Sequence, residues 1–110
     1  MKKVKIYSHY TKKGAETLSL LIKVKRLELR MTVKELAERV GCSRGLINRI
    51  EKGDLSCSLG SFFEVCSILG IELFDSDLEQ LGEKSYFLKE KMLLMPRKIK
   101  SKKIDLDDDF

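Results

Sequence analysis

Apolar residues recur at helical spacing in several short runs, and polar residues or glycines separate these runs. The first run begins at about Gly14, and the pattern becomes weak beyond Gly82. Recurrence every three or four residues favours helices over strands. The pattern therefore predicts five helices, the last of them short, over residues 14–30, 33–40, 44–52, 59–69 and 77–81.

The expected helix ends carry their own signals. Thr32 followed by Glu35 is a capping box, in which a hydroxyl and a carboxylate accept hydrogen bonds from backbone N–H groups that a helix start leaves unpaired. Ser43 and Ser58 stand where the N-caps of the third and fourth helices belong. Three glycines occupy positions at which a left-handed residue ends a helix: Gly41, Gly53 and Gly70.

The first helix carries two apolar stripes, where a surface helix needs one. The stripes consist of Leu18, Ile22 and Leu29 and of Leu20, Val24 and Leu27. Such a helix is either deeply buried or contacts a partner as well as its own core.

Both ends of the chain differ from the helical centre. The alternation at Val4 and Ile6 predicts a short strand or an extended basic arm, and residues 83–95 fit either a helix or a strand before Pro96. The end of the chain is a basic cluster followed by an acidic one, with little apolar mass to bury, so partial disorder is expected there. We therefore divide the chain into a basic arm or strand (1–13), a helical domain (14–82) and a C-terminal extension (83–110).

The second and third predicted helices follow a specific spacing. With Val33 as the first position, small residues fall at Ala37 and Gly41, where one helix must cross close to the other and the chain must turn. Apolar residues fall at the positions that hold two helices at a fixed angle, namely Leu36, Val40, Cys42, Ile47 and Ile50. This is the helix-turn-helix pattern.

Composition limits the alternatives. A chain of 110 residues builds one small core, and it contains neither an apolar run long enough for a membrane span nor a signal peptide, so we expect a cytoplasmic protein. Three widely spaced cysteines and one histidine supply no usual zinc spacing, and we expect no metal and no cofactor. The charge is uneven: residues 1–53 carry 14 Lys and Arg against 5 Glu, whereas residues 54–95 carry 3 against 8 acidic residues. The basic half suits a polyanion.

The segment GCSRG (41–45) also fits the G-x-S-x-G motif of serine hydrolases. That motif needs a strand before the serine and a histidine after it, whereas the residues before Ser43 have a helical pattern and the sole histidine, His9, precedes it. The chain is also too short for a hydrolase sheet with its covering helices. We therefore predict that the protein is not an enzyme.

The run MTVKELAERVGCSRGLINRIEKGD (31–54) resembles the DNA-binding domains of the Cro and phage-repressor class, the XRE family, over about residues 15–82. The resemblance implies an all-α, five-helix lambda-repressor-like domain whose third helix lies in the major groove. It implies that Ser43 caps this helix and touches phosphate, that Arg44, Asn48 and Arg49 face bases, and that Arg26 pairs with Glu51 inside the fold. Phosphate candidates are Lys34, Lys52 and Lys25.

Two positions depart from the family pattern. Val33 replaces a frequent glutamine, which removes one expected phosphate contact. Gly45 stands where a base-reading side chain is common, and it offers only close approach of the backbone to DNA. Recognition of the DNA base sequence is then expected to depend on Arg44 and Asn48.

A finer resemblance extends from Gly45 into the tail with LLMPRKI and DLDDDF. These segments are similar to HipB-type antitoxins, which implies a homodimer that binds operator DNA and recruits a HipA-like serine/threonine kinase toxin. The alternatives are a stand-alone repressor of phage or restriction-control type, and an interaction adaptor that has lost DNA binding.

Overall fold

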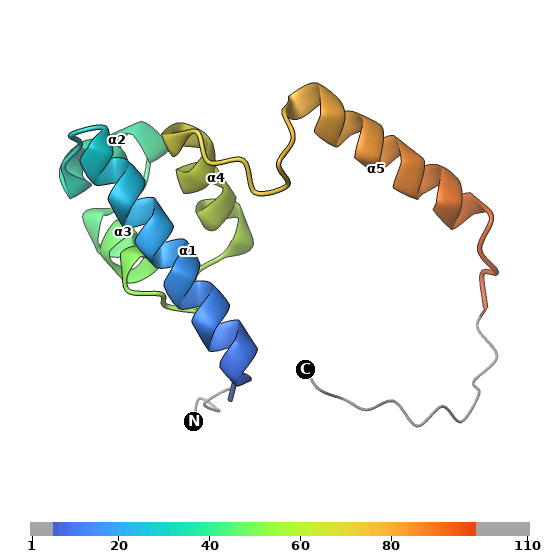
Figure 1. Cartoon of the computed structure of the whole chain (residues 1–110), viewed down its shortest axis with the longest axis horizontal. Coiled ribbons are helices and arrows are strands. Elements are labelled where there is room, and N and C mark those ends of the chain that lie inside the picture. Colours follow the sequence, from blue (N-terminus) through green and yellow to red (C-terminus); the bar gives the residue numbers. More distant parts are fainter. Residues whose placement is uncertain (1–5, 99–110) are drawn as a thin grey trace. The chain divides into compact units, whose positions relative to one another are not determined.

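The structure is a computed structural model and describes residues 6–98. These residues contain five helices and no strand (Figure 1). The predicted all-α fold class is confirmed. The helices are α1 (His9–Glu28), α2 (Val33–Val40), α3 (Arg44–Glu51), α4 (Leu59–Leu69) and α5 (Leu78–Leu93).

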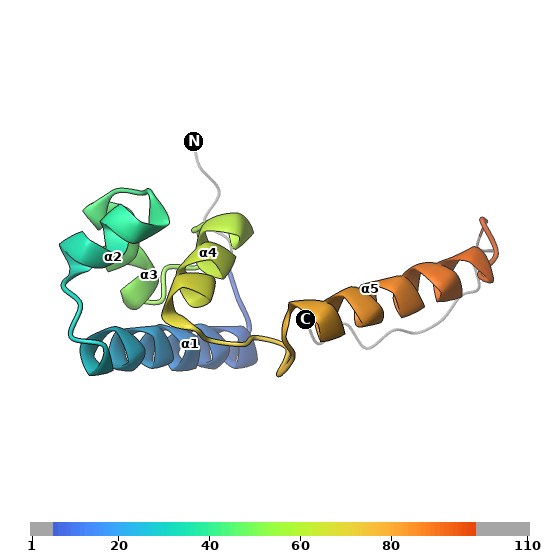
Figure 2. The same cartoon turned by 90° about the horizontal axis from the view of Figure 1, so that it is seen from above.

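The first four helices form a compact unit that ends at Ile71. Both α1 and α2 pack against α3 and α4, and Figure 2 shows α2, α3 and α4 on the same side of the longer α1. The side chains at the centre of this unit are at most 2% exposed: Ile22, Leu36, Ile47, Val65, Cys66 and Leu69. Cys66 therefore belongs to the core.

Helix α1 starts earlier than its apolar pattern suggests. Ser8 is the N-cap, and its hydroxyl oxygen accepts a hydrogen bond from the backbone N–H of Thr11 at 3.2 Å. Ile6 is 90% exposed and lies in no strand, whereas Val4, the other residue of the expected alternation, lies outside the described residues. A polar cap thus sets the helix start, because capping needs no apolar partner.

The second apolar stripe of α1 stays exposed within this unit. Leu20, Val24 and Leu27 are 52–55% exposed, whereas Ile22 is fully buried against the other helices. Since α2, α3 and α4 cover only one side of α1, no other helix of the four-helix unit covers the outer stripe. The sequence left two explanations for the two stripes of α1: deep burial, or contact with a partner as well as its own core. Within this unit α1 is not deeply buried.

Capping explains where the short helices begin and end. The Thr32–Glu35 capping box is present at the start of α2, and Ser58 caps α4 by accepting a hydrogen bond from the N–H of Ser61. Gly41 and Gly70 adopt left-handed φ values of 81° and 74°, a conformation in which a residue with a Cβ is strained. These predicted caps are confirmed.

Residues from Glu72 onward belong to a second unit. Its helix, α5, spans 16 residues from an Asp77–Gln80 capping box to Leu93, so the fifth helix is much longer than the short one predicted from residues 77–81. Of the two alternatives for residues 83–95, the structure contains the helix. The acidic end of the chain lies outside the described residues.

None of the helices within residues 6–98 combines the length and apolar content that crossing a bilayer requires.

Candidate nucleic-acid interface

The turn between α2 and α3 fixes the angle between these two helices. The N–H groups of Gly41 and Cys42 both donate to the carbonyl of Ala37, at 2.8 Å and 3.0 Å. Ala37 is 3% exposed, so a larger side chain at this position has no space beside α3. The small residue and the left-handed glycine therefore do what the sequence spacing predicted.

Helix α3 has two different faces. Ile47 and Ile50 point into the core and are at most 3% exposed. The opposite face is exposed and polar, and it contains Arg44, Gly45, Asn48, Arg49 and Lys52. We call these five residues the α3 outer face. It contains five of the seven residues that the sequence assigned to DNA binding.

Ser43 begins α3 as an N-cap. Its hydroxyl oxygen accepts a hydrogen bond from the N–H of Leu46 at 3.1 Å. The first N–H groups of a helix have no acceptor within the helix and carry partial positive charge, which suits a phosphate oxygen. The residue also follows a helix, α2, so the strand-to-helix elbow of a serine nucleophile is absent around Ser43.

Arg49 is held by the loop that follows α3. Its guanidinium donates to a carboxylate oxygen of Asp54 and to the hydroxyl of Ser56, both at 2.9 Å. Asp54 also accepts hydrogen bonds from the N–H and hydroxyl of Ser56 at 2.8 Å and 2.6 Å. Hydrogen bonds from Ser56 and from Arg49 hold the pKa of Asp54 well below its ordinary value. Arg49 is thus positioned by partners within the chain.

The contacts of Arg49 were not predicted from the sequence. Asp54 and Ser56 stand two residues apart just after Gly53, and an aspartate at this spacing accepts local hydrogen bonds in a turn. This spacing was the only sequence feature that could have indicated the contacts of Arg49. It is a weak indication, because Asp and Ser are common in loops that bind nothing.

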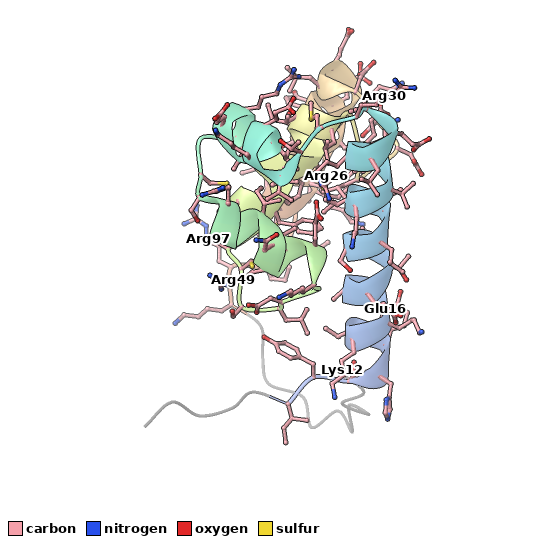
Figure 3. All side chains as sticks on the ribbon, turned by 90° about the vertical axis from the view of Figure 1, so that its left-hand side faces the viewer. Lys12, Glu16, Arg26, Arg30, Arg49 and Arg97 are labelled. Carbon is pink, nitrogen blue, oxygen red and sulfur yellow. The ribbon has the colours of Figure 1, made fainter. Side chains whose placement is uncertain are left out.

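Arg26 and Glu51 tie α1 to the end of α3, as the resemblance implied. The guanidinium donates through Nε to one oxygen of Glu51 at 2.6 Å and through a terminal nitrogen to the other at 3.0 Å. A third bond reaches the carbonyl of Met31 at 2.8 Å. Both charged side chains are less than 10% exposed, and the hydrogen bond to Glu51 raises the pKa of Arg26. Figure 3 shows Arg26 between α1 and α3.

The remaining candidates lie outside the recognition helix. Lys34, in the first turn of α2, is exposed, whereas Lys25 on α1 is half-buried. Cys42, expected to point into the core, is only half-buried, and its thiol donates to the carbonyl of Ser43 at 3.5 Å.

Comparison with known proteins gives one finding. Residues 22–75 match a family described as helix-turn-helix. No curated protein and no solved structure matches the chain. The matched segment contains α2, the Gly41 turn and α3 in the arrangement described above, which is that of a small helix-turn-helix domain of the lambda-repressor type. Over these residues the chain is similar to helix-turn-helix DNA-binding regulators, the class that the XRE resemblance of residues 31–54 indicated.

Proposed function

We propose that this protein is a sequence-specific repressor that binds its operator with the α3 outer face. The observation that carries the proposal is the exposure of Arg44 and Asn48 on one side of a helix whose other side is locked into the core by Ile47 and Ile50. A helix fixed in this way presents the same side chains to every DNA site, which sequence readout requires.

Each residue of this face has a role suited to its chemistry. Arg44 reads guanine through O6 and N7, and Asn48 reads adenine through N6 and N7, both by paired hydrogen bonds. Ser43 at the helix start, together with Lys34 and Lys52, contacts phosphates. Asp54 and Ser56 already hold the guanidinium of Arg49, so the main role of Arg49 is to fix the loop after α3 against that helix.

Replacing Arg44 with alanine is expected to weaken operator binding by about 1–3 kcal/mol and to relax specificity at one base pair. Gel shifts on the DNA upstream of the gene, with single base changes, would measure both effects. The matched control is Lys52→Ala, also on the α3 outer face, which should weaken all sequences alike and reduce the salt slope by about one. Equal weakening of all sequences by Arg44→Ala would show that Arg44 does not read a base.

Gly45 has no role inside the fold that demands a glycine. Its φ is not positive, and an added Cβ would meet only the hydroxyl oxygen of Ser43, at 3.8 Å. Glycine within a helix costs roughly 0.5–1 kcal/mol relative to alanine. A residue that costs stability without helping the fold is explained if the α3 backbone approaches DNA closely at this point.

Gly45→Ala is therefore expected to raise the free energy of unfolding by about 0.5–1 kcal/mol and yet to weaken operator binding. Chemical denaturation and gel shifts on the same preparation would give the two values. Gly60→Ala is the control, because Gly60 is an exposed glycine in α4 with nothing within 4 Å of an added Cβ. It should stabilise the protein without changing DNA binding. If Gly45→Ala also left DNA binding unchanged, close backbone approach would be wrong.

The finer proposal is that the repressor is a HipB-type antitoxin, acting as a homodimer that pairs with a HipA-like serine/threonine kinase toxin. The tail segments LLMPRKI and DLDDDF support it, and so does the exposed outer stripe of α1, which suits a partner. The test is co-purification of a kinase encoded beside this gene with the full chain. If a neighbouring kinase gene is absent, or its product does not bind, the stand-alone repressor is the better description.

A further inference from the structure

Helix α1 ends at a left-handed residue that is not a glycine. The N–H of Arg30 donates to the carbonyl of Leu27 at 3.0 Å. The N–H of Met31 donates to the carbonyl of Arg26 at 3.1 Å. These two hydrogen bonds form the Schellman motif, whose first donor residue adopts the left-handed conformation. Arg30 accordingly has a φ of 57°, so the chain has an arginine where the backbone favours glycine.

The other helices of the same unit end with a glycine at this position. Gly41, Gly53 and Gly70 follow α2, α3 and α4, with φ values of 81°, 77° and 74°. The residue after each glycine donates its N–H back to a helix carbonyl, as Met31 does. In the left-handed conformation a Cβ crowds the following carbonyl oxygen, and only glycine avoids this cost. Among these four helices, α1 is therefore the one with a strained end.

The side chain of Arg30 does not compensate this strain within the fold. It is exposed, and its guanidinium forms no hydrogen bond or ion pair with any of residues 6–98. Figure 3 shows it at the end of α1, beyond Arg26. Lys25 and Arg26 already place positive charge in the last turn of α1, where it suits the helix dipole. A strained residue that stabilises nothing in the fold indicates a function outside it.

The position of Arg30 indicates what that function is. Arg30 lies two residues before Thr32, the N-cap of α2, and the first helix of a helix-turn-helix crosses the DNA backbone. Val33 stands where the family resemblance expects a glutamine that contacts phosphate, and its apolar side chain cannot donate a hydrogen bond. The acidic side chain of this turn, Glu35, accepts hydrogen bonds from Thr32. A free guanidinium thus lies beside the start of α2, and its paired N–H groups suit a phosphate.

We propose that Arg30 contacts a backbone phosphate of the operator and replaces the contact that Val33 cannot make. This rests on the proposed function, since it requires the DNA that the α3 outer face reads. A phosphate contact carries no sequence information, but it fixes the position of the protein on the duplex. Arg30 therefore holds the start of α2 on the DNA backbone while Arg44 and Asn48 meet the base edges.

Arg30→Gly tests whether the arginine strains the end of α1. Glycine adopts a φ of 57° without a crowded Cβ, so the variant should be more stable than the wild type. We expect its folding equilibrium constant to rise about twofold to fivefold in urea denaturation of the full chain. Arg30→Gln keeps a Cβ at the same position, and it should leave this constant within about twofold of the wild type.

Arg30→Gln tests the phosphate contact. It should weaken binding to the operator and to unrelated DNA alike, by about fivefold to tenfold at ~0.1 M salt. The slope of log K against log salt concentration should become smaller by about one. The matched control is Lys23→Gln, which removes one positive charge from an exposed position of the same helix. It should change the affinity by less than about twofold and leave the slope unchanged.

Three results would overturn the proposal: an unchanged salt slope in Arg30→Gln, an equal loss of affinity in Lys23→Gln, or an Arg30→Gly variant less stable than the wild type. The last would mean that the guanidinium stabilises the end of α1. The wild type separates this test from the proposed function. A wild type that binds no DNA contradicts the repressor, and the Arg30 contact with it. A wild type that binds its operator, beside an Arg30→Gln variant with the same salt slope, contradicts the Arg30 contact alone.

Discussion

Arg26→Ala is expected to lower the free energy of unfolding by about 3–5 kcal/mol. The substitution leaves the carboxylate of Glu51 buried without its two charged hydrogen bonds, and it removes the donor to the carbonyl of Met31. A buried charge without a partner is far more costly than the pair is stabilising. For a domain of this size such a loss approaches the whole stability. Urea denaturation followed by circular dichroism would measure it.

Two further variants show whether the cost comes from the orphaned charge. Lys23→Ala, at an exposed position of the same helix, should change stability by less than about 0.5 kcal/mol. Replacing both partners, in Arg26→Met with Glu51→Met, should recover much of the loss because no buried charge remains. If the double variant were as unstable as Arg26→Ala, lost packing would be the cause and the ion-pair argument would fail.

Ile47→Ala is expected to destabilise the domain by about 2–5 kcal/mol. Ile47 is fully buried at the inner side of α3, and removal of its side chain leaves a cavity that the neighbouring helices only partly close. The folded fraction should still bind the operator with nearly the affinity of the wild type, because the α3 outer face is unchanged. Denaturation curves and gel shifts corrected for the folded fraction would separate the two quantities.

For Asn48, which follows Ile47 in the sequence, we expect the opposite: stability is kept and DNA binding is lost. Asn48→Ala, one position along α3 and exposed, should leave stability within about 0.5 kcal/mol and cost about 1–3 kcal/mol of operator binding. Loss of DNA affinity by the folded Ile47→Ala variant, equal to that of Asn48→Ala, would mean that the two faces of α3 are not independent.

The segment from α2 to α3 was predictable because the residues that determine its structure interact with residues close to them in the sequence. Thr32 with Glu35, Ser43 and Gly41 each satisfy a requirement of the backbone within a few residues, so the sequence alone predicts the α2 turn and the start of α3. The inner and outer faces of α3 follow from helical spacing in the same way. The Arg26–Glu51 pair, in contrast, joins residues far apart in the chain, and only the family resemblance indicated it.

Other features depend on interactions that a periodic pattern does not contain. The start of α1 is set by Ser8, before the first apolar repeat. The partners of Arg49 come from a loop that has no periodicity. Helix α5 mixes apolar and charged residues around most of its circumference, so its pattern favoured neither helix nor strand, although its capping box at Asp77 and Gln80 was readable.

The separation between the two faces of α3 has a consequence for how this regulator can change. Arg44 and Asn48 are exposed, and the side chains that fix the helix lie on the opposite side. Exchange of these two residues therefore requires no repacking of the core and should cost little stability. On the proposed base-reading role of these two residues, a new operator preference needs only one or two substitutions, and duplicated copies of such a gene would diverge in the promoters they control while they keep the same scaffold.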